Sequence, residues 1–280
     1  METLVVNAPA KINLCLHVLG RRADGYHELA MAMQRIDLCD RIEIALSAGA
    51  GIDVQCKGVA LDGAENIAAR AARALLEAAG LTRRVQIRID KRIPVAAGLG
   101  GGSSDAAAVL DGLNQMLGAP LNQEVLAELG GRLGADVPFF LFGRPAWATG
   151  IGTRLETLPP LPEVCYLILN PGFEVSTAWV YESLRLTKGG ELANLPRFSV
   201  TTTEGLLKAL HNDLEAVTAE RYPEIDRMKD FLKEHGALGA LMSGSGASVF
   251  GVFTDEETAS KACAAVSQPG WFAFVARPLA

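Results

Sequence analysis

The feature that most constrains this chain is a glycine-rich segment at residues 93–105, with the sequence IPVAAGLGGGSSD. Four glycines fall within five positions of it, at residues 98 and 100–102. Glycine accepts positive φ angles and lets another group approach the main chain closely, although it loses more conformational entropy on folding than other residues. Such a run is therefore expected where a ligand lies against the backbone.

The residues after this loop have the periodicity of a helix. Apolar side chains recur at three- and four-residue spacing over residues 106–117, which predicts an amphipathic helix with Ser103 or Ser104 as its N-cap. The first N–H groups of a helix lack intrahelical acceptors, and its N-terminus is the positive end of a dipole. The loop and the helix together predict an anion site of the kind that binds phosphate.

Two common phosphate-binding loops do not match this segment. The Walker loop needs a lysine before its Ser or Thr, and residues 103–104 are both serine here. The dinucleotide fingerprint would place its third glycine at Ser103, and residues 91–94 are long for its tight turn after the strand predicted at 85–89. Because the loop carries no lysine, positive charge must come from elsewhere. A turn without any ligand stays open as the alternative.

Length, charge and cysteine usage exclude several classes of function. A chain of 280 residues can form one large domain or two small ones. Its net charge of −6 argues against nonspecific binding to nucleic acid. Five scattered cysteines without metal-type spacing favour a reducing compartment, and no long apolar run or secretory start is present. We expect a cytoplasmic protein without nucleic-acid or membrane partners.

The order of the predicted elements indicates an α+β fold. Several strands precede the first clear helix, at 66–79, where Asn66 is expected as the N-cap, and mixed elements follow. The proline-rich residues 158–162 are the best linker, so two lobes are expected, 1–158 and 159–280, with the last strand free to return to the first lobe. We also expect a strand break at residues 8–10, one helix near 205–218 and a mobile polar excursion over 188–203.

Several side chains outside the loop have two readings each. Lys11 and Asn13 share one face of a predicted strand, which is either solvated or functional. Tyr26 and His27 end a turn-rich loop, where they either anchor the loop or stack on a flat ring. Asp136 precedes an apolar run, so it caps a helix at Val137–Pro138, lies in a cleft beside a cation, or does both.

Three motifs, at residues 9–14 (PAKINL), 94–108 and 241–251, together resemble the GHMP kinase superfamily, which transfers the γ-phosphoryl group of ATP to small alcohols or acids. With residues 20–27 and 134–140 added, the resemblance is to the branch that phosphorylates a cytidine-diphosphate-linked methylerythritol in the non-mevalonate isoprenoid pathway. It covers essentially the whole chain. It implies a two-lobed fold with the substrate in the cleft between an ATP-binding lobe and a substrate lobe.

The resemblance also implies roles for individual residues. Lys11 and Asp136 match the catalytic pair, with Asp136 accepting the proton of the substrate hydroxyl. The matched substrate-binding positions are Asn13, Tyr26, His27 and Thr177, with the Tyr26 ring and the His27 edge recognising cytosine. The matched ATP positions are Asn66, Pro94, Val95, Ala96, Ala97, Gly98, Leu99, Gly100, Gly101, Gly102, Ser103 and Ser104.

Mg²⁺ is expected on the ATP phosphates without an identified protein ligand. Asp105 is either a candidate for it or only a partner of the helix dipole. The chain departs from the family pattern at residues 95–97, where a further glycine is often found, and we expect a slightly stiffer loop there. The alternatives are a GHMP kinase for homoserine, mevalonate or a sugar, and a non-catalytic nucleotide or metabolite sensor. A monomer and a homodimer are both compatible with the sequence.

Overall fold

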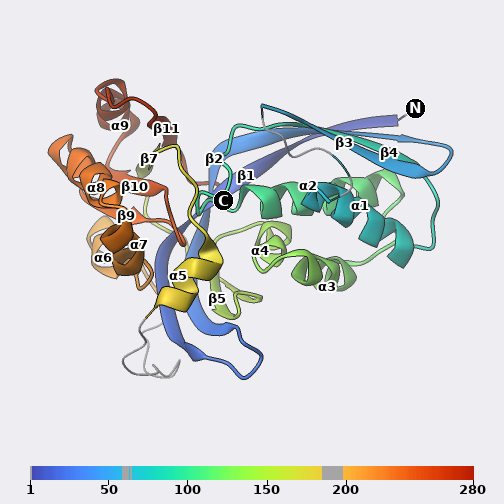
Figure 1. Ribbon diagram of the computed structural model, residues 1–280, viewed down its shortest axis with the longest axis horizontal. Coiled ribbons are helices and arrows are strands. Elements are labelled where there is room, and N and C mark those ends of the chain that lie inside the picture. The colour runs from blue at the N-terminus through green and yellow to red at the C-terminus, as the bar shows by residue number, and fades with distance from the viewer. Residues whose placement is uncertain (1, 59–62, 64, 185–197) are drawn as a thin grey trace. The chain divides into compact units, whose positions relative to one another are not determined.

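The computed structural model describes residues 2–58, 63, 65–184 and 198–280, and Figure 1 shows its elements. The chain forms two compact units, each assembled from separate segments. The first unit comprises Met1–Ala10, Leu38–Ile93 and Gly100–Gly143, and the second comprises Lys11–Asp37, Pro94–Leu99 and Arg144–Ala280. The boundary expected at residue 158 stays a prediction, and the excursion expected over 188–203 lies outside the described residues as far as 197.

The first unit packs helices on a sheet. Its strands include β3 (Gly51–Lys57) and β4 (Arg84–Asp90), which run parallel, and β4 pairs antiparallel with the end of β2 (His27–Ser47). Alternate residues of β4 are buried, as the pattern predicts for a strand with one face on the core. The helices are α1 (Ile67–Ala78), α2 (Gly101–Met116), α3 (Gln123–Leu133) and α4 (Val137–Phe142). Figure 1 shows all four on one side of β3 and β4.

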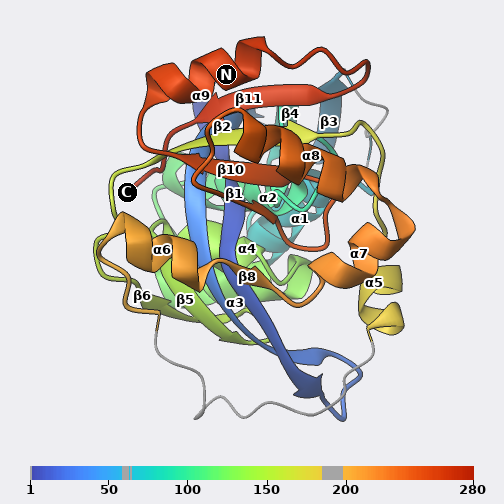
Figure 2. The same ribbon diagram turned by 90° about the vertical axis from the view of Figure 1, so that its left-hand side faces the viewer.

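The strands β1 (Glu2–Arg21) and β2 are divided between the units, and the second unit contains their residues 11–21 and 27–37. In the same sheet are β5 (Ala146–Gly150), β6 (Arg154–Thr157) and β8 (His211–Asn212). A separate antiparallel sheet has the order β11-β7-β10-β9, and Figure 2 shows α8 and α9 close to it. Its strands are β7 (Cys165–Asn170), β9 (Gly239–Met242), β10 (Val249–Phe253) and β11 (Phe272–Ala276). The helices are α5 (Thr177–Ser183), α6 (Thr203–Ala209), α7 (Glu215–Arg221), α8 (Glu224–Glu234) and α9 (Glu256–Ala264).

Two local predictions are wrong. The strand break expected at residues 8–10 is absent, because β1 continues through Pro9 with Ala8 and Ala10 both fully buried. The single helix expected over 205–218 is divided into α6, β8 and α7. The cause is a set of hydrogen bonds from Asn212, whose amide donates to the carbonyls of Met242 and Gly244, each at 2.8 Å. Hydrogen bonds to residues distant in the sequence thus override the local helical pattern. The predicted α+β class is confirmed.

The chain end returns to β2 within the second unit. Pro278 bridges Ile36, and the N–H of Leu279 donates to the carbonyl of Arg35 at 2.9 Å. Among the residues that the structure describes, no helix combines the length and the apolar character needed to cross a membrane.

Candidate functional site

In the second unit, the glycine-rich segment is held by a second small-residue loop at residues 243–248. Three hydrogen bonds fix its backbone: from Ser243 Oγ to Gly98 O (2.9 Å), from the N–H of Ser248 to Ala97 O (3.1 Å), and from the N–H of Lys11 to Leu99 O (3.0 Å). The motif at residues 241–251, to which the sequence assigned no role, therefore supports the glycine-rich segment.

Two positions in the part of this segment that belongs to the second unit, residues 94–99, have left-handed φ. Gly98 has φ +77°, and a Cβ placed on it would lie 2.0 Å from the carbonyl oxygen of Ser243. The glycine is thus required both by its conformation and by the closeness of another backbone segment. Ala96 has φ +50°, a conformation that penalises alanine. Ala96 lies within residues 95–97, where the resemblance led us to expect a further glycine, and its conformation is strained.

In the first unit, α2 begins one turn earlier than predicted. Gly100, with φ +71°, occupies the N-cap position and provides no side-chain cap, so the prediction of Ser103 or Ser104 as the N-cap is wrong. The first helical hydrogen bond runs from the N–H of Ser104 to Gly100 O at 2.9 Å. The preceding N–H groups belong to the first turn, where intrahelical acceptors are lacking, so an anion can bind there.

The starts of three helices of the first unit lie together. A Cβ placed on Gly134 would lie 3.5 Å from Ser103 Oγ, in the first turn of α2, and 3.9 Å from Ile67 Cδ1, in the first residue of α1. Asn66 and Asp136 are the N-cap residues of α1 and α4, next to these contacts. The structure thus brings three parts of the predicted site into one region of the first unit.

The side chains of Asn66 and Asp136 differ in their local roles. Asn66 Oδ1 accepts a hydrogen bond from the N–H of Ala68 at 2.8 Å, which confirms it as an N-cap. Asp136 is half-buried and precedes a helix with proline in its first turn, but its carboxylate does not cap that helix. A nucleotide contact of Asn66 and a catalytic role of Asp136 stay predictions.

Lys11 and Asn13 are buried within the second unit, with 4% and 1% of their surfaces exposed. Lys11 Nζ donates to Asn13 Oδ1 at 2.5 Å, and the N–H of Asn13 donates to Ser243 Oγ at 3.3 Å. The reading of a solvated strand face is therefore wrong. The backbone of Asn13 thus bonds to the same serine hydroxyl that fixes Gly98, and the Lys11 ammonium group is linked to this network through Asn13.

Two of the expected substrate-binding residues, His27 and Thr177, lie at α5 in the second unit. Tyr26 is 60% exposed, while the ring of His27 stacks on that of Tyr181 with 4.9 Å between centroids. Burial, followed by the charge of Arg21, lowers the pKa of His27. Thr177 begins α5, and its hydroxyl lies 2.9 Å from that of Ser245. Sequence reasoning missed Tyr181, which lies four residues after Thr177 on the same helix and was identifiable as its neighbour across one turn.

Sequence reasoning also missed a buried ion-pair cluster beside the start of α2. Lys91 Nζ donates to Asp105 Oδ2 at 2.8 Å and to Asp40 Oδ2. Burial raises the pKa of Asp105 to about 7, with the charge of Lys91 opposing this and that of Asp40 adding to it. Asp105 is therefore an ion-pair partner of Lys91, which neither reading of the sequence anticipated. The sequence shows a lysine after an apolar strand, but it gives no sign of the carboxylates that pair with it.

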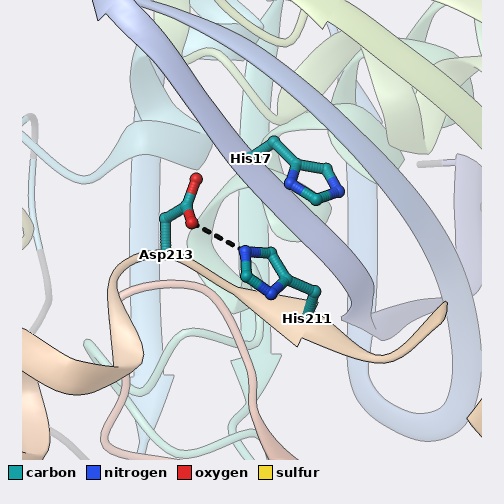
Figure 3. Close-up of side chains that lie close together, drawn as sticks. All are labelled: His17, His211 and Asp213. Atoms are coloured by element: carbon teal, nitrogen blue, oxygen red, sulfur yellow. Dashed lines mark hydrogen bonds and ion pairs between the residues drawn. The ribbon is translucent and has the colours of Figure 1, made fainter. Parts of the chain in front are cut away.

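A separate group of titratable side chains lies where β1 and β8 pair in parallel. Donor atoms of His17, His211 and Asp213 are all within 4.8 Å of one another, and Figure 3 shows the ion pair from His211 to Asp213, 2.7 Å long. The two rings are stacked, with centroids 4.6 Å apart and planes 18° apart. A metal ion lies in the plane of each imidazole that binds it, and these planes do not converge. We therefore assign no ion to this arrangement.

The comparisons with known proteins agree with this geometry. The family described as GHMP kinases N terminal domain matches residues 66–144, and GHMP kinases C terminal matches residues 193–270. A 4-diphosphocytidyl-2-C-methyl-D-erythritol kinase of Syntrophotalea carbinolica is 58% identical, over 97% of this chain and 98% of its own length. The kinase of the same name from Geobacter sp. (strain M21) is 53% identical over the whole of both chains.

Solved structures give the same result. A crystal structure of 4-(cytidine 5'-diphospho)-2C-methyl-D-erythritol kinase has a TM-score of 0.80 and 38% identity, covering 98% of this chain and 99% of that one. A homoserine kinase from Cytophaga hutchinsonii, 22% identical, has a TM-score of 0.75 over 99% of this chain and 95% of its own, and so shares the fold. The chain therefore belongs to the GHMP kinase family and, within it, to the 4-diphosphocytidyl-2-C-methyl-D-erythritol kinases.

Proposed function

We propose that this protein transfers the γ-phosphoryl group of ATP to the 2-hydroxyl of 4-diphosphocytidyl-2-C-methyl-D-erythritol, giving the 2-phosphate and ADP. The observation that carries the proposal is the 58% identity to a kinase of that name along almost the full length of both chains. The reaction belongs to non-mevalonate isoprenoid precursor synthesis. We place the protein in the cytoplasm, where ATP is available.

The nucleotide would bind the backbone of residues 94–104, with Asn66 nearby. Two features of these residues fit a triphosphate. Gly100 provides no side chain to cap α2, so the first-turn N–H groups are available to oxygen acceptors. Residues 94–104 also contain no acidic residue that would repel phosphate. Mg²⁺ would accompany the phosphates and neutralise part of their charge. We assign it no protein ligand, since the nearby Asp105 already pairs with Lys91.

The cytidine part of the substrate would bind Asn13, Tyr26, His27 and Thr177. The exposed ring of Tyr26 offers a flat apolar surface to a pyrimidine. His27 is neutral near pH 7 because its pKa is lowered, so its ring provides one N–H donor and one acceptor. A cytosine edge presents both kinds of group, which matches this pair better than it matches homoserine, mevalonate or a sugar.

The chemical step needs a proton acceptor and a cation near the transferred group. We assign the first role to Asp136. It comes two residues after Gly134, at which an added Cβ would lie 3.5 Å from Ser103 Oγ in the first turn of α2. The 2-hydroxyl oxygen forms a bond to the γ-phosphorus, the bond from that phosphorus to the β,γ-bridging oxygen breaks, and Asp136 takes the hydroxyl proton. Lys11, held by Asn13 and the loop backbone, supplies positive charge to the phosphoryl oxygens.

A coupled assay of ADP release with four substrates tests the proposal. We expect turnover with the cytidine-linked methylerythritol and none with homoserine, mevalonate or galactose. Preference for one of the other three would assign a different GHMP kinase, and substrate-independent ATP hydrolysis alone would indicate a sensor. Asp136→Asn is expected to lower kcat by roughly 10² or more with ADP affinity unchanged. Normal turnover of that variant would remove Asp136 from the mechanism.

A further inference from the structure

Lys91, Asp40 and Asp105, called here the buried triad, have no part in the mechanism above. Their side chains are 6%, 0% and 5% exposed, respectively. Lys91 Nζ donates to one oxygen of each carboxylate. The other oxygen of Asp40 accepts the backbone N–H groups of Arg92 and Ile93, at 2.6 and 2.9 Å. The triad thus joins the end of β4 and the residues after it to the second turn of α2.

These two segments are the stems of the glycine-rich loop, residues 94–100. They touch at its base: a Cβ placed on Gly101 would lie 3.0 Å from Ile93 Cγ2 and 3.4 Å from Lys91 Nζ. The loop therefore leaves the first unit and returns to it at neighbouring points. Because Lys91 bonds to Asp105 from one stem to the other, a single ammonium group links both ends of the loop.

The charges of the triad argue against a direct role of Lys91 in phosphate binding. One ammonium faces two carboxylates, and Asp105 and Asp40 already accept its hydrogen bonds. The group therefore adds no net positive charge beneath the loop. Burying three ionisable groups also has a large desolvation penalty, and such clusters often stabilise a fold no better than apolar residues of the same size. What the triad provides that apolar residues would not is a directional connection between two stems.

We propose that the buried triad is the positioning group of the nucleotide loop, with Lys91 holding the two stems at the spacing at which the loop backbone meets a triphosphate. The inference rests on the nucleotide-binding role proposed above. If the stems separate, only a fraction of the molecules has a competent loop, and the apparent affinity for nucleotide falls in proportion to that fraction. The chemical step is unaffected once nucleotide is bound, so the effect falls on affinity and on KM for ATP, with kcat little changed.

Three variants separate the connection from the charge. Lys91→Met and Asp105→Ala both break the link between the stems, whereas Asp105→Asn keeps an oxygen that can accept from Lys91. We expect calorimetry with ADP to show affinity weakened about tenfold or more in the first two variants and within about threefold of normal in Asp105→Asn. Amide hydrogen exchange of residues 91–105 should accelerate in the first two variants and stay slow in the third.

The control is Leu126→Ala, which removes a fully buried side chain of α3 in the same unit and should lower stability without weakening ADP binding. Should Lys91→Met fail to fold, Asp105→Ala carries the test, because it leaves the pair of Lys91 and Asp40. Normal ADP affinity and normal exchange in a folded Asp105→Ala would overturn the inference. A wild-type protein that binds no ADP would instead refute the nucleotide-binding role, while accelerated exchange in the variants would still support the link between the stems.

Discussion

Replacing Gly98 by alanine tests the contact between residues 94–99 of the glycine-rich segment and the small-residue loop at 243–248, both in the second unit. The added methyl carbon would lie 2.0 Å from the carbonyl oxygen of Ser243 and 3.1 Å from the N and O atoms of Gly246. All of these are backbone atoms, so no side-chain rotation relieves the overlap. Either the loop at 243–248 or the glycine-rich segment must move.

The expected loss of stability has two parts. Alanine at φ +77° is disfavoured by about 1–2 kcal/mol relative to glycine. Overpacking against fixed atoms adds about 1–3 kcal/mol. Gly118 isolates the first part, because its φ is +81° and a Cβ there has nothing within 4 Å. We therefore expect Gly98→Ala to lower the free energy of unfolding by about 2 kcal/mol more than Gly118→Ala does.

Urea unfolding of both variants, followed by calorimetry with ADP, measures the two consequences. Gly98→Ala should also weaken ADP binding, because the hydrogen bond from Ser243 Oγ to the carbonyl of Gly98 cannot survive the displacement. Gly118→Ala should bind ADP normally. Equal losses of stability in the two variants, together with normal ADP affinity in both, would refute the reasoning from this contact.

Two further outcomes can be measured by equilibrium unfolding. Ala96→Gly should raise the free energy of unfolding by up to about 1 kcal/mol, since it relieves φ +50° at an alanine; a loss would show that this conformation is not strained. For Asp105, the folded pKa of about 7 exceeds the unfolded value near 3.8, so the folded state binds the extra proton and wild-type stability falls as pH rises from about 4 to about 7. The decline is worth about 1.4 kcal/mol per unit of pKa difference, and Asp105→Asn should lack it. Stability that falls equally with pH in the wild type and in Asp105→Asn would contradict this expectation.

The elements that local sequence determines were predictable. The helix expected at 66–79 is α1, which begins after the predicted cap Asn66, and the strand expected at 85–89 is β4. Their signals are apolar spacing and a capping residue, which act over one or two turns. The helix expected over 205–218 failed for the opposite reason. Asn212 finds its hydrogen-bond partners 30 and 32 residues away, and no local pattern records them.

The candidate site shows the same division. The glycine-rich loop was recognisable because its composition is unusual, and Lys11 with Asn13 because they share a strand face. The buried triad was not, since Lys91 pairs with a carboxylate 51 residues earlier in the chain and another 14 residues later. The sequence indicated that positive charge had to come from outside the loop. It could not show that the nearest lysine is already occupied by two carboxylates.

The glycines of the segment at 93–105 are required for different physical reasons, and this difference leads to a last prediction. Gly98 is required by another loop and Gly101 by the stem residues Ile93 and Lys91, so the protein's own atoms account for both. At Gly102 neither reason holds, because an added Cβ would meet Ile67 Cγ2 at an ordinary 3.7 Å and φ is not left-handed.

Within the first turn of α2, alanine should therefore be tolerated at position 102 and even favour the helix, by up to about 1 kcal/mol. If residue 102 is glycine because phosphate oxygens approach its backbone, Gly102→Ala should weaken ADP binding about tenfold while stability is kept or raised. Unfolding and calorimetry on the same preparation distinguish the cases. Unchanged ADP affinity would mean that the triphosphate does not approach this turn, and a large loss of stability would mean that packing requires the glycine after all.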